Sequence, residues 1–342
     1  MGRWLRRFAW MLLGAAIAVP ATWLARDHFT ITRPLREARA AFAAKQYLLA
    51  YELTQKHVRQ KDAPYVPAAA ALAARSLVEL GRFEEADALF RGLPVDEEGE
   101  VSSWARALVA LHRPDDAIAL CERFAPRFSG ADFLRAQVVA LTERRRIPEA
   151  RAAAQKLRAI PGEEIAGDLM LGNIENRASK PAEAARHLAA ALERDLELKG
   201  QPVKTERVVG ELCESLVQLD RFDEAAGWAY KAFARFQSPA LACIAAGVEV
   251  KRVQPEAAQV WFKRALEIDR EFVKAMLGLG DLELAGGKPG PALRWFEKAA
   301  ALAPDDARAA AGIAAARRRI DGTSGGPPAT PPRAGASPPD AR

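Results

Sequence analysis

Apolar and polar positions recur along this chain with a long period of about 34 residues. Eight alanines mark the phase, and successive ones are separated by 31 to 41 residues. Three places before each stands an aromatic, aliphatic or proline residue, and an acidic residue usually lies one or two places before it. A period near 34 is typical of a helical repeat array. The alanines are Ala50, Ala86, Ala117, Ala150, Ala184, Ala225, Ala258 and Ala292.

The pattern around each alanine predicts two helices joined by a turn. Twelve places before it stands a residue of the first helix with a small or medium-sized side chain, as at Ala74 and Gly280. The second helix is expected to open three places before the alanine, where acidic residues favour the helix dipole and proline is tolerated. The opening residues are Tyr47, Phe83, Pro114, Ile147, Pro181, Phe222, Pro255 and Pro289. Neither helix can bury its apolar face alone, so neighbouring repeats must stack.

These segments resemble the tetratricopeptide repeat (TPR). GRFEEADALF (81–90) and KPGPALRWFEKAAALAP (288–304) are similar to the turn and second helix of that family, and LGLGDLELAGG (277–287) is similar to its first helix. The resemblance implies an all-α fold, a right-handed α-solenoid of about eight TPR helix-turn-helix repeats over residues 31–320. A basic helix at 306–320 is similar to a capping helix. A single transmembrane helix is expected to precede the array.

Three departures from the pattern predict local irregularities. The first repeat carries Glu37 where an apolar residue is usual, which makes that repeat doubtful. Gly92-Leu93-Pro94 shortens the repeat at Ala86. The widest gap between alanines holds an insertion near 198–205, which we interpret as a loop between the fifth and sixth repeats.

The N-terminal segment 1–29 is expected to be a membrane signal-anchor. Residues 8–25 are eighteen uncharged residues, preceded by Arg3, Arg6 and Arg7. This length lies at the short edge of what spans a bilayer. A signal peptide, cleaved after Ala21, is the alternative and would give a secreted protein. The arginines favour a cytoplasmic N-terminus, which would place the repeats on the extracytoplasmic, periplasmic side.

The C-terminal segment and the net charge add little about function. Residues 321–342 are rich in proline, glycine and alanine, without a large apolar side chain, so we expect a disordered tail. The net charge of +6 is modest for 342 residues. It does not require a nucleic-acid partner.

No group of residues in the sequence points to catalysis. Cys121, Cys213 and Cys243 are far apart and fall on apolar helix positions, where packed thiols are expected. The four histidines form no zinc-binding spacing with each other or with cysteine. We therefore predict no catalytic residue, no cofactor and no metal ion, and no enzyme.

The candidate functional residues lie where a TPR array lines its concave groove. In that family the first helices form this surface. The residue after each small position, and those three and four places further on, are expected to face it, and Arg135 lies near them. The predicted groove is basic near the N-terminus, rich in amides in the middle and less polar at the far end. Its residues are Arg39, Arg75, Arg106, Arg135, Asn173, Asn176, Arg177, Gly247, Val250 and Leu284.

Two functions follow from this groove. The first is a membrane-anchored scaffold that binds a peptide or protein partner, with an acidic or carboxylate-bearing segment held by the arginines. The alternative is binding of an anionic polymer or nucleic acid through the same arginines. Aromatic residues suited to base stacking are not interleaved with them, which disfavours the alternative. The sequence does not indicate the oligomeric state.

Overall fold

The computed structural model describes residues 33–58, 66–196, 198 and 202–324. Over these residues the chain forms 17 α-helices and no strand. It divides into an N-terminal unit, residues 1–180, and a C-terminal unit, residues 181–342. The predicted membrane segment 8–25 and the tail from 325 lie outside the described residues. None of the described helices has the length and apolar character to cross a bilayer.

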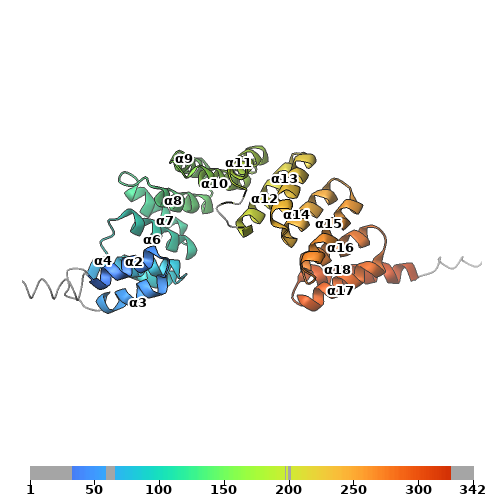
Figure 1. Ribbon diagram of the computed structural model, residues 1–342, viewed down its shortest axis with the longest axis horizontal. Coiled ribbons are helices and arrows are strands. Elements are labelled where there is room, and N and C mark those ends of the chain that lie inside the picture. The colour runs from blue at the N-terminus through green and yellow to red at the C-terminus, as the bar shows by residue number, and fades with distance from the viewer. Residues whose placement is uncertain (1–32, 59–65, 197, 199–201, 325–342) are drawn as a thin grey trace, which may run out of the picture. The chain divides into compact units, whose positions relative to one another are not determined.

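The N-terminal unit is a stack of four antiparallel helix pairs followed by a single helix (Figure 1). First helices contact the first helices of the next pair, as α4 contacts α6 and α6 contacts α8. The pairs are α2 (Arg33–Ala43) with α3 (Tyr47–Val58), α4 (Val66–Glu79) with α5 (Phe83–Arg91), α6 (Glu98–Ala110) with α7 (Pro114–Phe124), and α8 (Ala131–Glu143) with α9 (Ile147–Arg158). Helix α10 (Glu164–Arg177) packs on α9.

The C-terminal unit begins with the second helix of the fifth repeat. Three further helix pairs and a last helix follow, each packed on its predecessor (Figure 1). The helices are α11 (Pro181–Arg194), α12 (Pro202–Gln218), α13 (Phe222–Phe236), α14 (Pro239–Lys251), α15 (Pro255–Ile268), α16 (Val273–Ala285), α17 (Pro289–Leu302) and α18 (Ala307–Ser324).

The helix starts confirm the predicted repeat. All eight second helices open at the residue three places before the phased alanine, from Tyr47 in α3 to Pro289 in α17. The first repeat, which Glu37 made doubtful, forms its helix pair, because Glu37 is exposed and hydrogen-bonded to Arg33 while Leu35 and Ala38 are buried. The expected shortening near Gly92 is also present, since α5 spans only nine residues.

The turn between the two helices has the same backbone conformation in every repeat. The residue five places before the phased alanine has a positive φ, between 55° and 75°. The two N–H groups there bond back to the first helix, as Gly81 N–H to Val78 O at 3.1 Å and Arg82 N–H to Leu77 O at 2.9 Å. This is the Schellman arrangement, which satisfies the last carbonyls of a helix. The eight residues are Lys45, Gly81, His112, Arg145, Ser179, Asp220, Val253 and Gly287.

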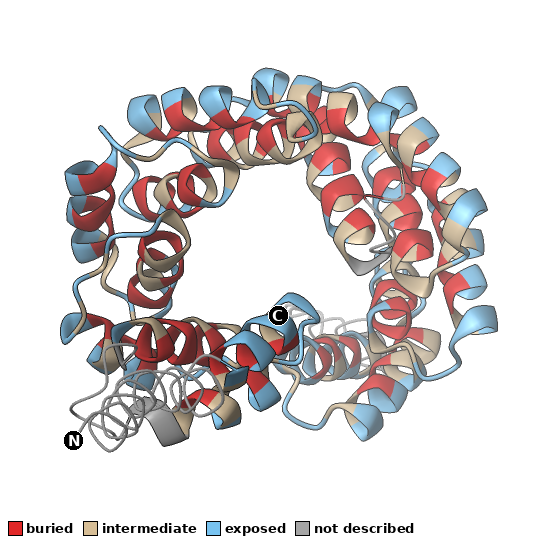
Figure 2. Cartoon of the chain, turned by 60° about the vertical axis from the view of Figure 1, so that its left-hand side comes forward, coloured by how far each residue is buried: buried red, intermediate tan, exposed pale blue. Residues whose placement is uncertain are grey.

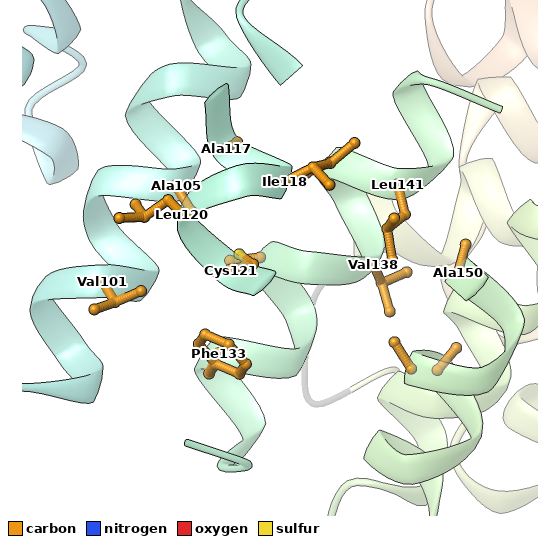
Figure 3. Packing of buried hydrophobic residues seen from close by; sticks show 14 of the residues in the cluster. Val101, Ala105, Ala117, Ile118, Leu120, Cys121, Phe133, Val138, Leu141 and Ala150 are labelled. Carbon is orange, nitrogen blue, oxygen red and sulfur yellow. The ribbon is translucent and has the colours of Figure 1, made fainter. Parts of the chain in front are cut away.

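The core lies between the helices and follows the predicted positions. All eight phased alanines have a relative exposure of 0%. Figure 2 shows buried residues on the helix faces that are turned toward neighbouring helices. In the N-terminal unit one cluster joins α6, α7, α8, α9 and α10, and Val101, Cys121 and Phe133 are among its members (Figure 3). Small side chains at the alanine positions let the backbones of paired helices approach closely.

Two boundaries differ from those expected. The insertion at 198–205 is not wholly a loop, because α12 begins at Pro202, where a proline fits the first helical turn. The last helix, α18, continues four residues past Ile320, to Ser324, into the segment assigned to the tail. The remaining boundaries of the proposed tail and of the membrane segment stay predictions.

A candidate partner-binding groove in the N-terminal unit

A groove of about 810 Å³ crosses the first helices of the N-terminal unit. Its lining comes mainly from α2, α4, α6 and α8, with the start of α3 and α5 at its edge. Four cationic and two acidic side chains line it, so its lining has an excess of positive charge. The lining residues are Phe42, Lys45, Tyr47, Arg75, Glu79, Phe83, Gly99, Ser102, Ser103, Arg106, Val109, Ala110, Asp132, Arg135, Ala136 and Val139. We call it the N-terminal groove.

Three of the five predicted arginines lie together in this groove: Arg75 on α4, Arg106 on α6 and Arg135 on α8. Arg75 and Arg106 follow the small residues Ala74 and Ala105 directly, which turns both toward the same surface, whereas Arg135 lies three places before Val138. Arg39 is exposed on α2 and does not line the groove.

Arg75 is held by packing rather than by a carboxylate. Its guanidinium carbon lies 4.8 Å from the centroid of the Phe42 ring, a cation–π contact. Gly99 leaves room for its head group, since a Cβ on that glycine would lie 3.0 Å from Arg75 Nη2. The buried Arg75 Nε has no hydrogen-bond partner among the described residues, and no carboxylate there lies within ion-pair distance of this side chain. Arg75 therefore keeps charge and donors for a ligand.

The other two groove arginines already have acidic partners. Arg106 Nη1 lies 2.6 Å from Glu79 Oε1, which joins α6 to α4. Arg135 Nη1 lies 2.8 Å from Asp132 Oδ1, and its Nη2 bonds Glu163. These pairs neutralise much of the positive charge that the arginine row suggested from sequence.

Apolar side chains provide the rest of the groove surface. Val109 and Ala110 on α6 are followed by Ala136 and Val139 on α8, and Val139 is 41% exposed. The hydroxyls of Ser102 and Ser103 donate to carbonyls of their own helix. The groove thus presents the guanidinium of Arg75 at α4, the ammonium of Lys45 in the turn after α2, and an aliphatic surface at α6 and α8.

The remaining predicted residues of the N-terminal unit lie on α10. Asn173 and Asn176 are half-buried, and Arg177 Nη2 lies 2.9 Å from Glu143 Oε1 of α8. None of the three lines the N-terminal groove. Their role in partner binding stays a prediction.

The three predicted groove residues of the C-terminal unit, Gly247, Val250 and Leu284, are less polar than those of the N-terminal unit. Gly247 is exposed on α14, and no atom lies within 4 Å of a Cβ built on it. Val250, on the same helix, is 41% exposed. Leu284 on α16 is half-buried and packs against the cluster around Phe296, so its side chain serves the core.

Several groove residues were missed by the sequence analysis. Phe42, Gly99 and Val139 were not singled out, and neither were the acidic partners Asp132 and Glu163. Asp132 lies three residues before Arg135, a helical spacing that indicates a surface ion pair. Glu163 comes from the loop before α10, and no local pattern joins it to Arg135.

The three cysteines are packed in the helices. Burial raises the pKa of Cys121, Cys213 and Cys243 to about 12, so these thiols are protonated at neutral pH. A thiolate is the nucleophilic form of cysteine, and none of the three supplies it there. Across the ranges that the structure describes, no three His, Cys, Asp or Glu side chains gather around a common point as metal ligands.

Sequence comparisons identify no relative of this chain. No protein-family model matches it, and a search of characterised proteins finds no match.

Solved structures share its fold. A tetratricopeptide repeat protein from Parabacteroides merdae is 12% identical, with a TM-score of 0.51, over 74% of this chain and 98% of that one. The C-terminal part of a TPR repeat-containing protein from Cytophaga hutchinsonii is 16% identical, with a TM-score of 0.50, over 64% of this chain and 86% of that one. A chain of the APC/C hetero-tetramer Cut9–Hcn1 is 13% identical, with a TM-score of 0.48, over 83% of this chain. The match covers only 55% of that longer chain. With its all-helical pairs, this chain has the fold of tetratricopeptide repeat proteins.

Proposed function

We propose that this protein is a membrane-anchored scaffold that binds a carboxylate-bearing segment of a partner protein in the N-terminal groove. The observation that carries the proposal is Arg75, whose charge is packed against Phe42 and lacks an acidic partner in the described structure. A guanidinium can hold a carboxylate through two parallel hydrogen bonds. The TPR fold supports a role in protein binding rather than in catalysis.

The distribution of charge favours a protein partner over an anionic polymer. A polyanion is held by many cations that each neutralise a phosphate or similar group. Arg106, Arg135 and Arg177 are already paired with carboxylates. A long run of negative charge in a ligand would therefore add little to the binding affinity, because it would compete with these carboxylates.

Membrane anchoring by residues 8–25, with the repeats on the periplasmic side, is part of the same proposal. We expect the full-length protein to stay in the membrane pellet after an alkaline carbonate wash. Protease added to right-side-out spheroplasts should digest the repeats. A mature protein that begins at Thr22 would show cleavage instead, and full protection from protease would reverse the orientation.

The groove is tested with the partner captured from detergent-solubilised membranes and binding kinetics at two ionic strengths. Arg75→Glu with Arg106→Glu should slow association and reduce its salt dependence, since complementary charge acts strongly on encounter rate. The matched control is Arg317→Glu with Arg318→Glu on α18. If both double variants bind like the parent, the arginine row is a solvated face without a binding role.

A further inference from the structure

Among the described residues, the cations of the N-terminal groove that lack a carboxylate partner lie at one end, Arg75 on α4 and Lys45 in the turn after α2, and the aliphatic surface of the groove lies at the other end. Arg75 lies on α4, whereas Val109 and Ala110 lie on α6 and Val139 on α8. Since each first helix contacts the next, the groove crosses α4, α6 and α8 in that order. An extended peptide that crosses these helices would meet the guanidinium first and the aliphatic surface afterwards, or the reverse.

Packing distances convert this order into a spacing along the ligand. Axes of packed helices are about 8–10 Å apart. An extended chain advances about 3.3 Å per residue. The Arg75 head group lies beside Gly99 of α6, and Val109 follows ten residues later on that helix, which is about 15 Å along its axis. A residue bound at Arg75 is therefore separated from those at Val109 and Val139 by about four or five residues.

The ion pairs in the groove limit how much negative charge it accepts. Glu79 holds Arg106, and Asp132 and Glu163 hold Arg135. A second or third carboxylate of a ligand that lies over α6 or α8 would be near these acidic side chains and would have to displace them from their arginines. Like charges brought together in this way oppose binding and act as a selection against acidic runs.

From these observations we propose that the groove selects a segment with a single acidic residue and aliphatic residues about four and five places from it. This inference rests on the proposed function and specifies the chemistry of its partner. Arg75 binds the carboxylate, with the guanidinium oriented by Phe42 and seated beside Gly99. A pre-oriented side chain loses less entropy on binding, which strengthens the contact. Val109 and Val139 contact the two aliphatic side chains.

The inference is tested with fluorescein-labelled dodecapeptides and the full-length protein in detergent. One probe places a single aspartate four and five residues before leucines in a Ser/Gly/Gln background, and a second has the reversed order. A third replaces aspartate with asparagine, and a fourth replaces the leucines with aspartates. By fluorescence anisotropy, one of the first two should bind at least tenfold more tightly than the third and the fourth.

Variants of the protein assign this preference to the groove. Arg75→Gln should remove the difference between the aspartate and asparagine peptides, and Val139→Asn should weaken the leucine peptides. Arg106→Gln, which also removes a groove arginine, should leave the preference for a single aspartate in place. Circular dichroism melting shows whether each variant stays folded. The matched control outside the groove is Arg317→Gln on α18, which should bind every peptide like the parent.

The outcomes separate the inference from the proposed function. If the aspartate-rich peptide binds best, or the asparagine peptide binds as well as aspartate, the inference is wrong. If no peptide binds but the captured partner still depends on Arg75 and Arg106, the selection rule is wrong while the scaffold function stands. If the partner too is indifferent to both arginines, the inference and the proposed function fail together.

Discussion

The two units use the same repeat positions for different purposes. In the N-terminal unit the residue after the small position of a first helix is Arg75 or Arg106, and both line a groove. In the C-terminal unit the small position itself is Gly280, and it makes room for Phe296. The phased alanines are fully buried in both units. The comparison teaches that the alanine positions set the fold, while the neighbouring positions are free to serve binding or packing.

The largest expected effect concerns the aromatic packing of the C-terminal unit. Phe296 is fully buried in the cluster that joins α16, α17 and α18. Phe296→Ala should cost about 3–5 kcal/mol of stability, since it leaves a cavity that helices can fill only in part. Hydrogen exchange measured by mass spectrometry should show faster exchange in α16–α18 and unchanged exchange in α2–α9. Equal acceleration in both units would show that the effect of this substitution is not confined to α16–α18.

A pair of glycine substitutions sharpens the contrast inside the C-terminal unit. A Cβ on Gly280 would lie 2.7 Å from Phe296, whereas one on Gly247 would meet no atom within 4 Å. Gly280→Ala should therefore destabilise the unit by about 1–3 kcal/mol through overpacking. Gly247→Ala should stabilise it by about 0.5–1 kcal/mol, because alanine favours an exposed helix interior. Thermal melts of the two variants should move in opposite directions.

An acid titration tests a buried carboxylate of the N-terminal unit. Asp87 accepts from Trp104 Nε1 at 2.9 Å and from Arg91 and Arg113 at 2.6 and 2.8 Å. Burial alone would raise its pKa, but the bonds from Trp104 and Arg91 and the two positive charges lower it below the usual 3.8. A lowered pKa gives stability that is present above pH 4 and is lost as the pH falls through the folded value.

Replacing this carboxylate should remove the contribution of Asp87 to the pH dependence of the free energy of unfolding. Asp87→Asn should cost about 1–3 kcal/mol near neutral pH, since the two arginines lose a charged acceptor. Denaturant unfolding at pH 7 and at pH 3 measures both effects. A difference between parent and variant that is as large at pH 3 as at pH 7 would show that Asp87 does not carry the acid sensitivity.

A small effect is also expected in the turns, which both units share. Val253 has a φ of 60° and is 83% exposed, so a β-branched residue occupies a left-handed conformation without any packing gain. Val253→Gly should stabilise the protein by about 1 kcal/mol, because glycine adopts this conformation without strain. Gly81→Val makes the opposite change in the N-terminal unit and should lower the melting temperature. Equal melting temperatures for all three proteins would mean that the turns carry no strain.

The repeat architecture could be predicted from the sequence because it depends on local periodicity. The starts of the second helices, from Tyr47 to Pro289, and the buried alanines follow from residues within one repeat. The start of α12 at Pro202 was not predicted, because residues 198–205 were interpreted as a loop and the proline was counted as part of it.

The candidate site was predictable only in outline. The repeat spacing predicted that Arg75 and Arg106 lie together, because first helices stack in register, and Arg135 lines the same groove from another position of its helix. The spacing could not show which arginine lacks an acidic partner within the described part of the protein and can therefore bind a carboxylate of a ligand. That depends on contacts between repeats, such as Arg75 with Phe42 of α2 and Arg135 with Glu163, 28 residues away.

The left-handed turn residues also give a way to measure the molecule in solution. All eight are exposed, and their backbone geometry is the same whether the side chain is lysine, histidine, serine or glycine. A spin label or dye attached there reports position without disturbing a core, and the native thiols, with a pKa of about 12, compete little for reagent. His112→Cys with Val253→Cys would place one label on each unit. The distance between the labels would then report how far the two units move relative to one another, with and without a bound partner.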